Sequence, residues 1–457
     1  MKRTSAAGAP LAQIFRAAAP VWVQVRSGQS LERALLPHAA ARGAPATPLA
    51  AAVRDVCHDA LRHCALIEAL LEKLVRRPAS PQVAGLLAVA LSQLLDGAYP
   101  EYVVVDQAVT AARVDPSLRP ASGFVNAILR AFLRRRAILV PGLLADDAKR
   151  LNVPPWWLQR MQRDHPQAWE PVLVESGRAP PLVLRVNRRR IDVDAYLARL
   201  QDEGVAASRV GDVAVWLHRP TPVARIPGFH EGLVSVQDAG AQMAAPWLGV
   251  SGSMRVLDAC AAPGGKTGHL AELSDAQVDA LEVDPQRARR IGENLQRLGP
   301  MGPPVRILVA DAARPDSFWD GRPYERILLD APCTGSGIVR RHVDIPWLRR
   351  ESDVAQLATI QAGLLDAMWP LLAPAGRLLY VVCSVFRDEA AQQAESFLER
   401  HPDARPALLP DTNFTSLQLF PSSHLLPASF DPAKREAAIG LPTVHDGFFF
   451  ALIQKAG

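Results

Sequence analysis

Apolar residues recur at three- and four-residue spacings through the first 140 residues, a pattern that predicts amphipathic helices. Residues 81–98 are apolar almost all round, so we expect a central, buried helix there. Residues 122–136 form a further predicted helix, with Ser122 as its N-cap candidate. Its last turn carries three positive charges that suit the helix dipole, on Arg134, Arg135 and Arg136. No strand-like alternation interrupts this region, and we expect an all-α bundle over residues 1–143.

The pattern changes in the next part of the chain, residues 144–235. A proline opens a short helix in residues 153–166, and residues 191–204 have the spacing of an amphipathic helix. Residues 181–187 and 213–218 alternate between apolar and polar positions, as half-buried strands do. This mixture of short elements predicts a small α/β connector module.

From residue 236 to residue 457 strand and helix patterns alternate regularly. Apolar runs predict strands at 254–258, 278–283, 305–310, 326–330, 376–383 and 447–454. Helical patterns fall between them, at 284–298 and 353–372 among others. Strands separated by helices imply right-handed crossovers and a parallel sheet covered on both faces. We therefore expect an α/β domain here, the last of three.

Composition narrows the class of protein only in part. The chain has 457 residues, too many for one core, and its 49% hydrophobic and 21% charged residues are ordinary for a globular protein. The five cysteines form no CxxC pair, so neither a disulfide framework nor a metal site is expected. No sustained apolar stretch suggests a signal peptide or a membrane span. Reactive thiols need a reducing compartment, which predicts a cytoplasmic protein. The sequence shows no signal of a subunit interface, so we expect a monomer.

A net charge of +5 favours a polyanionic partner without identifying it. Basic residues gather in three places along the chain. They are Arg113 to Arg150, which includes Arg134–Arg136; Arg185 with Arg188, Arg189 and Arg190; and Arg340, Arg341 and His342. Any one such cluster is more often a solvated face than a binding site. Three of them together favour contacts with nucleic acid phosphates, with Arg134–Arg136 and residues 340–342 as the candidates.

A glycine-rich loop follows the first strand of the α/β domain. Gly264 and Gly265 can adopt positive φ and let a ligand approach the backbone, and the next helix offers free N–H groups. The spacing matches neither a P-loop nor GxGxxG. The candidate cofactor-binding residues are Cys260, Ala261, Ala262, Pro263, Gly264, Gly265 and Lys266.

Acidic residues end the successive strands of the same domain, at Asp258, Asp284, Asp311 and Asp330. One aspartate in such a place is usually a helix N-cap. Four of them beside a glycine loop predict a nucleoside-type cofactor, with Asp284 or Glu282 on the ribose hydroxyls and Asp311 near an adenine edge. Because no Lys-Ser/Thr pair for phosphates is present, the pattern favours S-adenosylmethionine.

Two cysteines, Cys333 and Cys383, follow two of the predicted strands. In an open parallel sheet the carboxyl ends of strands border the ligand cleft, so we expect both thiols to face it. A thiolate that adds to C6 of cytosine makes C5 nucleophilic toward an electrophilic methyl group, and Asp330 can bond N3 and N4 of the same base. A single cysteine would be interpreted as a small buried hydrophobe. The pattern alone does not decide which thiol attacks.

At these residues the chain resembles the Nop2/Sun family of RNA cytosine-5 methyltransferases, and within it the bacterial 16S rRNA enzymes of the Sun/Fmu type. The matching stretches are SVQDAGAQ (235–242), LDACAAPGGKT (257–267), LDAPCTGSGIVRRHVDIPWLRR (329–350), CSV (383–385) and DGFFFALIQK (446–455). SGFVNAILRAF (122–132) resembles NusB, an RNA-binding helical bundle.

The resemblance implies a Rossmann-like methyltransferase domain that binds S-adenosylmethionine through residues 260–266, Asp284, Asp311 and Asp330. It implies that Cys383 is the nucleophile and that Cys333 aids product release. It also implies 16S rRNA as the substrate. One departure is Val382, where the family has a threonine.

Three other functions remain open from the sequence. The chain could be a NusB-like RNA-binding protein without catalytic activity, although its complete set of Asp, Gly and Cys residues argues against that. It could methylate another RNA. A DNA methyltransferase is disfavoured by the NusB-like bundle and by the motif at Cys383.

Overall fold

The computed structural model describes residues 9–38, 47–300, 302–409, 424–427 and 444–457. The chain divides into two compact units. The first unit comprises Met1–Trp169 together with Val339–Glu351, and the second comprises Glu170–Ile338 together with Ser352–Gly457. Among the described residues, no helix combines the length and apolar character that crossing a bilayer requires.

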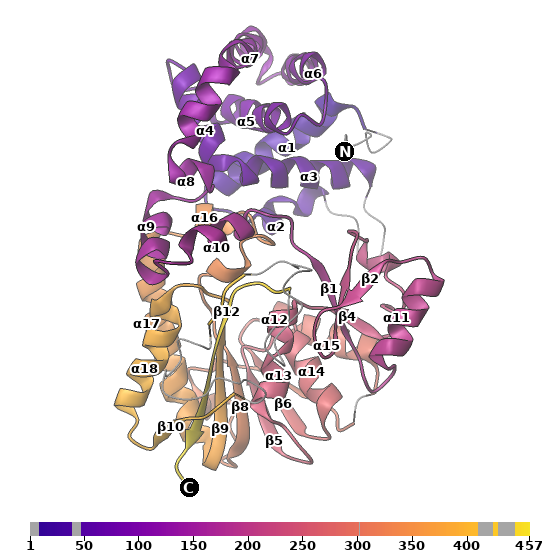
Figure 1. The fold of residues 1–457 in the computed structure, drawn as a ribbon, viewed down its shortest axis with the longest axis vertical. Helices are drawn as coiled ribbons and strands as arrows, with labels where there is room; N and C mark the ends of the chain where they lie inside the picture. The colour runs from indigo at the N-terminus through magenta and orange to yellow at the C-terminus, as the bar shows by residue number, and fades with distance from the viewer. Residues whose placement is uncertain (1–8, 39–46, 301, 410–423, 428–443) are drawn as a thin grey trace. The chain divides into compact units, whose positions relative to one another are not determined.

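The first unit is a helical bundle, as predicted (Figure 1). Its main helices are α1 (Leu11–Arg26), α3 (Pro48–Arg62), α4 (Cys64–Leu74), α5 (Pro81–Asp96), α6 (Glu101–Val114) and α7 (Ser122–Leu144). Helix α5 is the central buried helix, and Ser80 caps it by accepting a hydrogen bond from the Val83 amide. A Cβ atom at Gly85 would lie 2.7 Å from the Ala19 carbonyl oxygen, so glycine is what lets α5 approach α1 so closely.

Helix α7 differs from the prediction at both ends. Its N-cap is Ala121 rather than Ser122, and no side chain caps it, because the 3₁₀ turn Arg119–Ala121 continues directly into the helix. The helix extends to Leu144, so Arg134, Arg135 and Arg136 lie in its middle and not in its last turn. The apolar residues that follow, such as Leu139 and Leu143, pack against the bundle core and carry the helix further.

A short segment from the middle of the α/β domain belongs to the first unit, which the sequence did not suggest. It contains α16 (Ile345–Leu348), whose Trp347 lies 5.4 Å beneath the Arg26 guanidinium. Asp344 is buried and accepts a hydrogen bond of 2.8 Å from the Leu31 amide at the start of α2 (Leu31–Ala34). The core of the bundle is thus completed by chain that begins a few residues after Cys333.

Three shorter helices, α8 (Asp147–Arg150), α9 (Pro155–Asp164) and α10 (Trp169–Ser176), follow α7. The second unit starts at Glu170 in α10 and continues with the connector, a four-stranded antiparallel sheet of order β2-β3-β1-β4. Its elements are β1 (Leu182–Val186), α11 (Val193–Asp202), β2 (Ala207–Arg209), β3 (Ala214–Leu217) and β4 (Val234–Val236). The sequence predicted only β1 and β3, because strands of three residues are too short to show alternation.

The larger sheet of the second unit has the order β10-β12-β9-β8-β5-β6-β7. Its strands are β5 (Arg255–Ala259), β6 (Gln277–Glu282), β7 (Arg306–Val309), β8 (Tyr324–Asp330), β9 (Leu372–Val382), β10 (Ala404–Pro406) and β12 (Phe448–Lys455), with β11 (His424–Leu425) beside β12. The strands from β5 to β9 are parallel. Strands β10 and β12 are antiparallel additions, so the prediction of a wholly parallel sheet was wrong at this edge, since apolar runs do not encode strand direction.

Helices cover both faces of this sheet, as predicted (Figure 1). Helices α17 (Glu351–Met368) and α18 (Ala391–Arg400) pack on one face, through residues such as Leu365 and Phe397. Helices α13 (Ala244–Leu248), α14 (Gly265–Leu273) and α15 (Pro285–Leu298) cover the other face, through residues such as Leu248, Leu270 and Ile291. The predicted α/β sandwich is therefore present.

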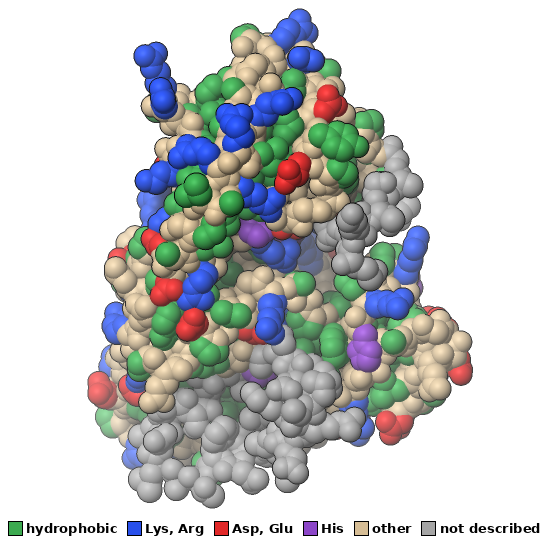
Figure 2. Space-filling model, turned by 45° about the horizontal axis from the view of Figure 1, so that its top comes forward, with side chains coloured by type: hydrophobic (Ala, Val, Ile, Leu, Met, Phe, Trp, Pro, Cys, Tyr) green, Lys and Arg blue, Asp and Glu red, His purple; other side chains and the backbone are tan. Residues whose placement is uncertain are grey.

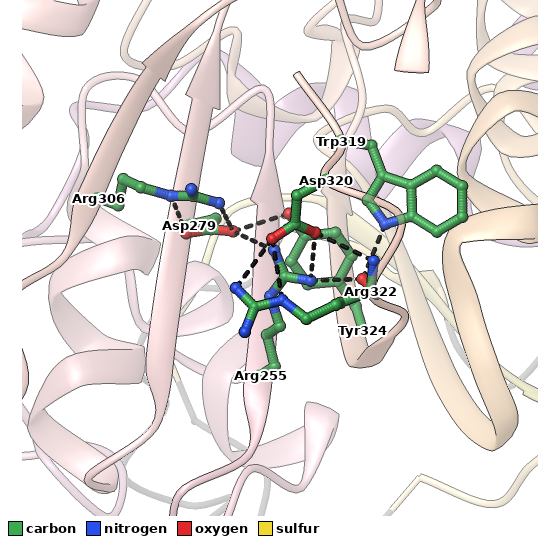
Figure 3. A network of polar contacts seen from close by, with 7 residues as sticks. All are labelled: Arg255, Asp279, Arg306, Trp319, Asp320, Arg322 and Tyr324. Atoms are coloured by element: carbon green, nitrogen blue, oxygen red, sulfur yellow. Dashed lines mark hydrogen bonds and ion pairs between the residues drawn. The ribbon is translucent and has the colours of Figure 1, made fainter. Parts of the chain in front are cut away.

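A polar network joins the amino ends of the parallel strands (Figure 3). Asp279 of β6 accepts hydrogen bonds of 2.6 Å from Arg306 of β7 and 2.7 Å from the Tyr324 hydroxyl of β8. Arg255 of β5 lies 3.4 Å from the same carboxylate and 2.8 Å from Asp320. These contacts hold four strands in register at their amino ends. The candidate site lies at the opposite, carboxyl ends of the strands.

Candidate active site

The glycine loop after β5 is held in place by residues around it. Gly264 has a φ of 92°, and a Cβ there would lie 3.1 Å from the Ile291 backbone, so the loop conformation requires glycine. The buried carboxylate of Glu282 accepts hydrogen bonds from the amides of Ala262 (3.4 Å) and Asp284 (3.1 Å). One side chain of β6 therefore joins the loop to the start of the next helix.

Arg185 supports the same loop from the connector sheet. Its guanidinium is buried, donates a hydrogen bond of 2.6 Å to the Gly265 carbonyl, and forms a two-point ion pair with Glu272 at 2.6 and 3.0 Å. Although the sequence placed Arg185 in a basic cluster, its burial excludes contact with RNA phosphates and gives it a role in loop geometry. The sequence did not reveal that Arg185 pairs with Glu272 or supports the loop, because the two residues lie 87 positions apart.

Two predicted cofactor residues also act as turn or helix caps. Asp284 accepts from the amides of Gln286 (2.7 Å) and Arg287 (3.2 Å), and both bonds go to Oδ1. Asp311 accepts from the Ala313 amide through Oδ1 at 2.9 Å. In Asp284 these amide bonds leave Oδ2 for a ligand hydroxyl, so capping and ligand binding are compatible there. In Asp311, Oδ2 lies 3.9 Å from the exposed Arg314 guanidinium.

Apolar side chains lie beside these acids. Val283 and Val309 are 62% and 53% exposed at the ends of β6 and β7. Exposed valines next to carboxylates suit a ligand with a flat apolar ring and a hydroxylated sugar. Together with the glycine loop they fit an adenosine-containing cofactor.

Asp258, at the end of β5, is fully buried beneath the loop. The Thr267 hydroxyl donates a 2.6 Å hydrogen bond to it. Burial raises the pKa of Asp258 to about 7, against the opposing effect of that hydrogen bond.

We expect this aspartate to make stability fall as the pH rises. Below about pH 4 both folded and unfolded chains hold the proton, whereas between about 4 and 7 only the folded chain does. The stabilisation is therefore lost as pH rises through 7. The melting temperature of Asp258→Asn relative to that of the natural chain should rise by several degrees between pH 5 and pH 8. The exposed control Asp202→Asn should differ from the natural chain by the same amount in melting temperature at pH 5 and at pH 8. The same result for Asp258→Asn would contradict the effect of burial.

Lys266 of the glycine loop forms an ion pair with Asp330 at the end of β8, with a distance of 2.6 Å. Burial opposes its charge, but attraction from Asp330, and then from Cys383, raises the pKa of Lys266 above its usual value. The ammonium group thus lies where it can stabilise both a carboxylate and a thiolate. The sequence predicted Lys266 only as part of the cofactor loop.

The structure brings the two predicted catalytic thiols together. The Sγ atoms of Cys333 and Cys383, which follow β8 and β9, lie 3.3 Å apart. The hydrogen bond to Cys383, burial, and the nearby charges of Cys383 and Glu389 raise the pKa of Cys333 well above its usual value. Cys260 has a φ of 62°, and burial raises the pKa of its thiol to about 12. Only Cys333 and Cys383, among the described cysteines, share one small volume.

The predicted RNA-binding residues differ in their exposure. Arg134 and Arg135 are exposed on the first unit, where Figure 2 shows many basic side chains. Arg136 is partly buried and contacts Glu101 and the Leu95 carbonyl, both at 3.3 Å. In the other cluster His342 is exposed and Arg341 is partly buried. Arg340 is only 1% exposed, so its guanidinium does not lie on the surface where we expected it.

Comparison with known proteins decides the family. Residues 245–454 match the family described as 16S rRNA methyltransferase RsmB/F, residues 153–224 match its ferredoxin-like domain, and residues 13–134 match the NusB family. The ribosomal RNA small subunit methyltransferase B of Salmonella typhi is 38% identical over 394 residues, which cover 85% of this chain and 90% of the relative. The protein of that name from Citrobacter koseri is 39% identical over 78% of this chain and 83% of the relative. The chain belongs to the RsmB/F methyltransferase family.

Solved structures share the fold of this chain. PH0851 aligns with a TM-score of 0.74 over 97% of this chain and 99% of that one, at 22% identity. A methyltransferase homologue from Pyrococcus horikoshii has a TM-score of 0.54 and 26% identity over 67% of this chain and 97% of that one. The predicted fold class is confirmed: a NusB-like bundle, a small α/β module and a methyltransferase domain. Membership of a methyltransferase family also confirms S-adenosylmethionine as the predicted cofactor. Within the described part of the chain, no cluster of His, Cys, Asp or Glu could hold a metal ion.

Proposed function

We propose that this RsmB/F methyltransferase transfers a methyl group from S-adenosylmethionine to C5 of a cytosine in 16S rRNA, through a covalent bond between Cys383 and C6 of the base. The observation that carries the proposal is the pair of thiols 3.3 Å apart, with Lys266 and Asp330 in an ion pair beside them. A cytosine C5 is a poor nucleophile, so a reaction there needs a covalent activating group.

The chain's own residues supply each requirement of this reaction. The Cys383 thiolate adds to C6, and the electron pair of the C5=C6 bond becomes available at C5. Asp330 accepts a hydrogen bond from N4, and a proton from the Lys266–Asp330 pair at N3 favours addition by withdrawing electrons. S-adenosylmethionine, when bound, supplies an electrophilic methyl group. Once C5 carries the methyl group, a base takes the C5 proton, the electrons of the C5–H bond reform the C5=C6 double bond, and Cys383 leaves as a thiolate. We assign Cys333 to this stage of product release.

The surroundings of the two thiols differ in charge, which supports Cys383 as the nucleophile. The ammonium of Lys266 lies near Cys383, whereas the carboxylate of Glu389 lies near Cys333 and helps to raise the pKa of the Cys333 thiol. A thiol with a raised pKa holds little thiolate at neutral pH, so Cys333 is the poorer nucleophile. Val382, the departure from the family pattern, is fully buried and pairs with Phe449, so its side chain contributes packing under the nucleophile.

The substrate assignment is tested by methyl transfer to protein-free 16S rRNA, to 16S rRNA in assembled subunits, to tRNA and to duplex DNA. We expect transfer to 16S rRNA, with one cytosine protected from bisulfite conversion. Transfer to tRNA or DNA alone would show that 16S rRNA is not the substrate. Binding of RNA without any transfer would favour a non-catalytic RNA-binding protein.

Three wider assignments accompany this proposal. We assign residues 1–143 to RNA binding, 144–235 to the connector and 236–457 to catalysis. We place the protein in the cytoplasm, where a reducing environment preserves the thiols. We also propose that it acts as a monomer, which size-exclusion chromatography with light scattering would test.

The exposed arginines of α7 are expected to contact phosphates. Replacing Arg134 and Arg135 by Gln should weaken RNA binding and reduce the slope of log K against log salt by up to about 2, because each lost phosphate contact lowers it by about 0.9. Binding titrations at several salt concentrations measure this slope. The matched control is Arg76→Gln with Arg77→Gln, which removes the same charge from an exposed loop of the same unit. Equal slopes for the two double variants would mean that only net charge matters.

A further inference from the structure

A buried carboxylate links the two cysteine loops. Glu389, in the short turn Arg387–Glu389, has no exposed surface. Its Oε1 accepts hydrogen bonds from the Thr334 amide (2.8 Å) and from the Gln361 side chain (3.1 Å). Its Oε2 accepts from the hydroxyls of Thr334 (2.5 Å) and Ser384 (2.6 Å). Four donors therefore converge on one side chain.

Two partners of Glu389 are the immediate neighbours of the two thiols in the chain. Thr334 follows Cys333 in the chain, and Ser384 follows Cys383. Gln361 of α17 also donates to the Pro332 carbonyl, just before Cys333, at 2.9 Å. Movement of either loop thus breaks hydrogen bonds to a group that has no access to water, which is costly.

A second contact joins the loops to each other. The Ser336 hydroxyl lies 2.9 Å from the Ser384 hydroxyl and accepts a 2.9 Å hydrogen bond from the Val385 amide. The backbone of Glu389 is also held, because its carbonyl accepts a 2.7 Å hydrogen bond from the Tyr380 hydroxyl. The carboxylate is therefore the centre of a rigid network rather than a loose surface acid.

The charge on Glu389 distinguishes the two sulfur atoms. Burial raises the pKa of Glu389, while hydrogen bonds from Ser384 and Thr334 favour its ionised form. Its charge contributes to the raised pKa of Cys333. The compensating positive charge near the other thiol is that of Lys266.

We propose that Glu389 is a positioning residue: its hydrogen bonds hold the two cysteine loops so that the sulfur atoms stay in contact and Cys383 is the thiol presented for attack. The assignment of attack to Cys383 rests on the proposed cytosine chemistry. The positioning itself does not, since it follows from hydrogen bonds present without substrate.

The separation of the thiols is tested with dibromobimane, a short cross-linker of neighbouring thiols, on the full chain without RNA or methyl donor. Peptide mapping should find Cys333 linked to Cys383 in the natural chain. Glu389→Ala should reduce this product at least 5-fold and kcat at least 100-fold, with KM for RNA changed less than 2-fold. Glu389→Gln, which keeps the shape, should restore the cross-link but move the alkylation of Cys333 to lower pH. Glu399→Gln, on the exposed side of α18, is the charge-matched control and should behave as the natural chain.

Natural levels of both the cross-link and kcat in Glu389→Ala would overturn the proposal. If Glu389→Ala fails to fold, Ser384→Ala decides, because it removes one of the four hydrogen bonds: we expect a 2- to 3-fold loss of cross-link and about a 10-fold loss of kcat, and no change would overturn the proposal. A protein whose cross-link depends on Glu389 but which does not methylate cytosine would refute the proposed function and leave the positioning intact.

Discussion

Cys383→Ala is expected to abolish methyl transfer to RNA, with a loss in kcat of about three orders of magnitude or more, because the activating covalent bond to the base no longer forms. The neighbouring sulfur of Cys333 does not substitute for it. Although it lies only 3.3 Å away, its pKa is raised well above the usual range, so little thiolate is present at neutral pH. Transfer of a tritiated methyl group to 16S rRNA measures the loss.

The matched control for this variant is Cys57→Ala. Cys57 is buried in the helical bundle, where burial raises the pKa of its thiol to about 12, and it takes no part in the reaction. Its loss should lower stability by about 1 kcal/mol through a small cavity and leave kcat within about 2-fold. Full activity of Cys383→Ala would show that Cys333 is the nucleophile after all.

Cys333→Ala is expected to trap the enzyme on its product. The Cys383 thiolate still adds to the base, but without its neighbour the final elimination is slow, and turnover should fall by about 100-fold or more. A covalent protein–RNA adduct that survives denaturing electrophoresis should accumulate in the presence of S-adenosylmethionine. Addition to the base and release of the product are separate steps. Cys333→Ala should therefore accumulate the adduct, whereas Cys383→Ala should not form it.

The control for the adduct is the double variant Cys333→Ala with Cys383→Ala, which should form none. Normal turnover by Cys333→Ala, without an adduct, would remove the release role. Turnover lost without an adduct would instead mean that Cys333 is needed for addition. These outcomes separate the two thiols more sharply than activity alone.

Local pattern was sufficient for the framework of the site. The strands β5, β6, β8 and β9 lie within a few residues of the predicted ranges, because period and apolar composition depend on neighbours in the chain. The parallel arrangement of those strands then brings Cys333 and Cys383 to one edge. Glycine at position 264 was also foreseen from its conformational freedom, and the structure gives it a φ of 92°.

Local pattern was insufficient where a residue's role depends on a distant partner. Arg185 looked like part of a phosphate-binding cluster, yet it is buried against Glu272 and the glycine loop. Arg340 looked exposed, yet it lies inside the first unit, in a segment that also supplies the Asp344 contact to Leu31. Charge in the sequence does not reveal burial, because burial is decided by which segments pack together.

By itself the sequence determined the order of bundle, connector and sheet, the glycine loop, the acids at the strand ends and the two cysteines, since each follows from short-range spacing or residue chemistry. Only the tertiary structure decided that the sulfur atoms touch, that Lys266 pairs with Asp330, and that Glu389 holds both cysteine loops. The physical reason is distance along the chain: the sulfur pair joins residues 50 positions apart, Glu389 and Thr334 are 55 apart, Lys266 and Asp330 are 64 apart, and Asp344 and Leu31 are 313 apart. Such pairings arise from the packing of the whole chain, which no local periodicity records.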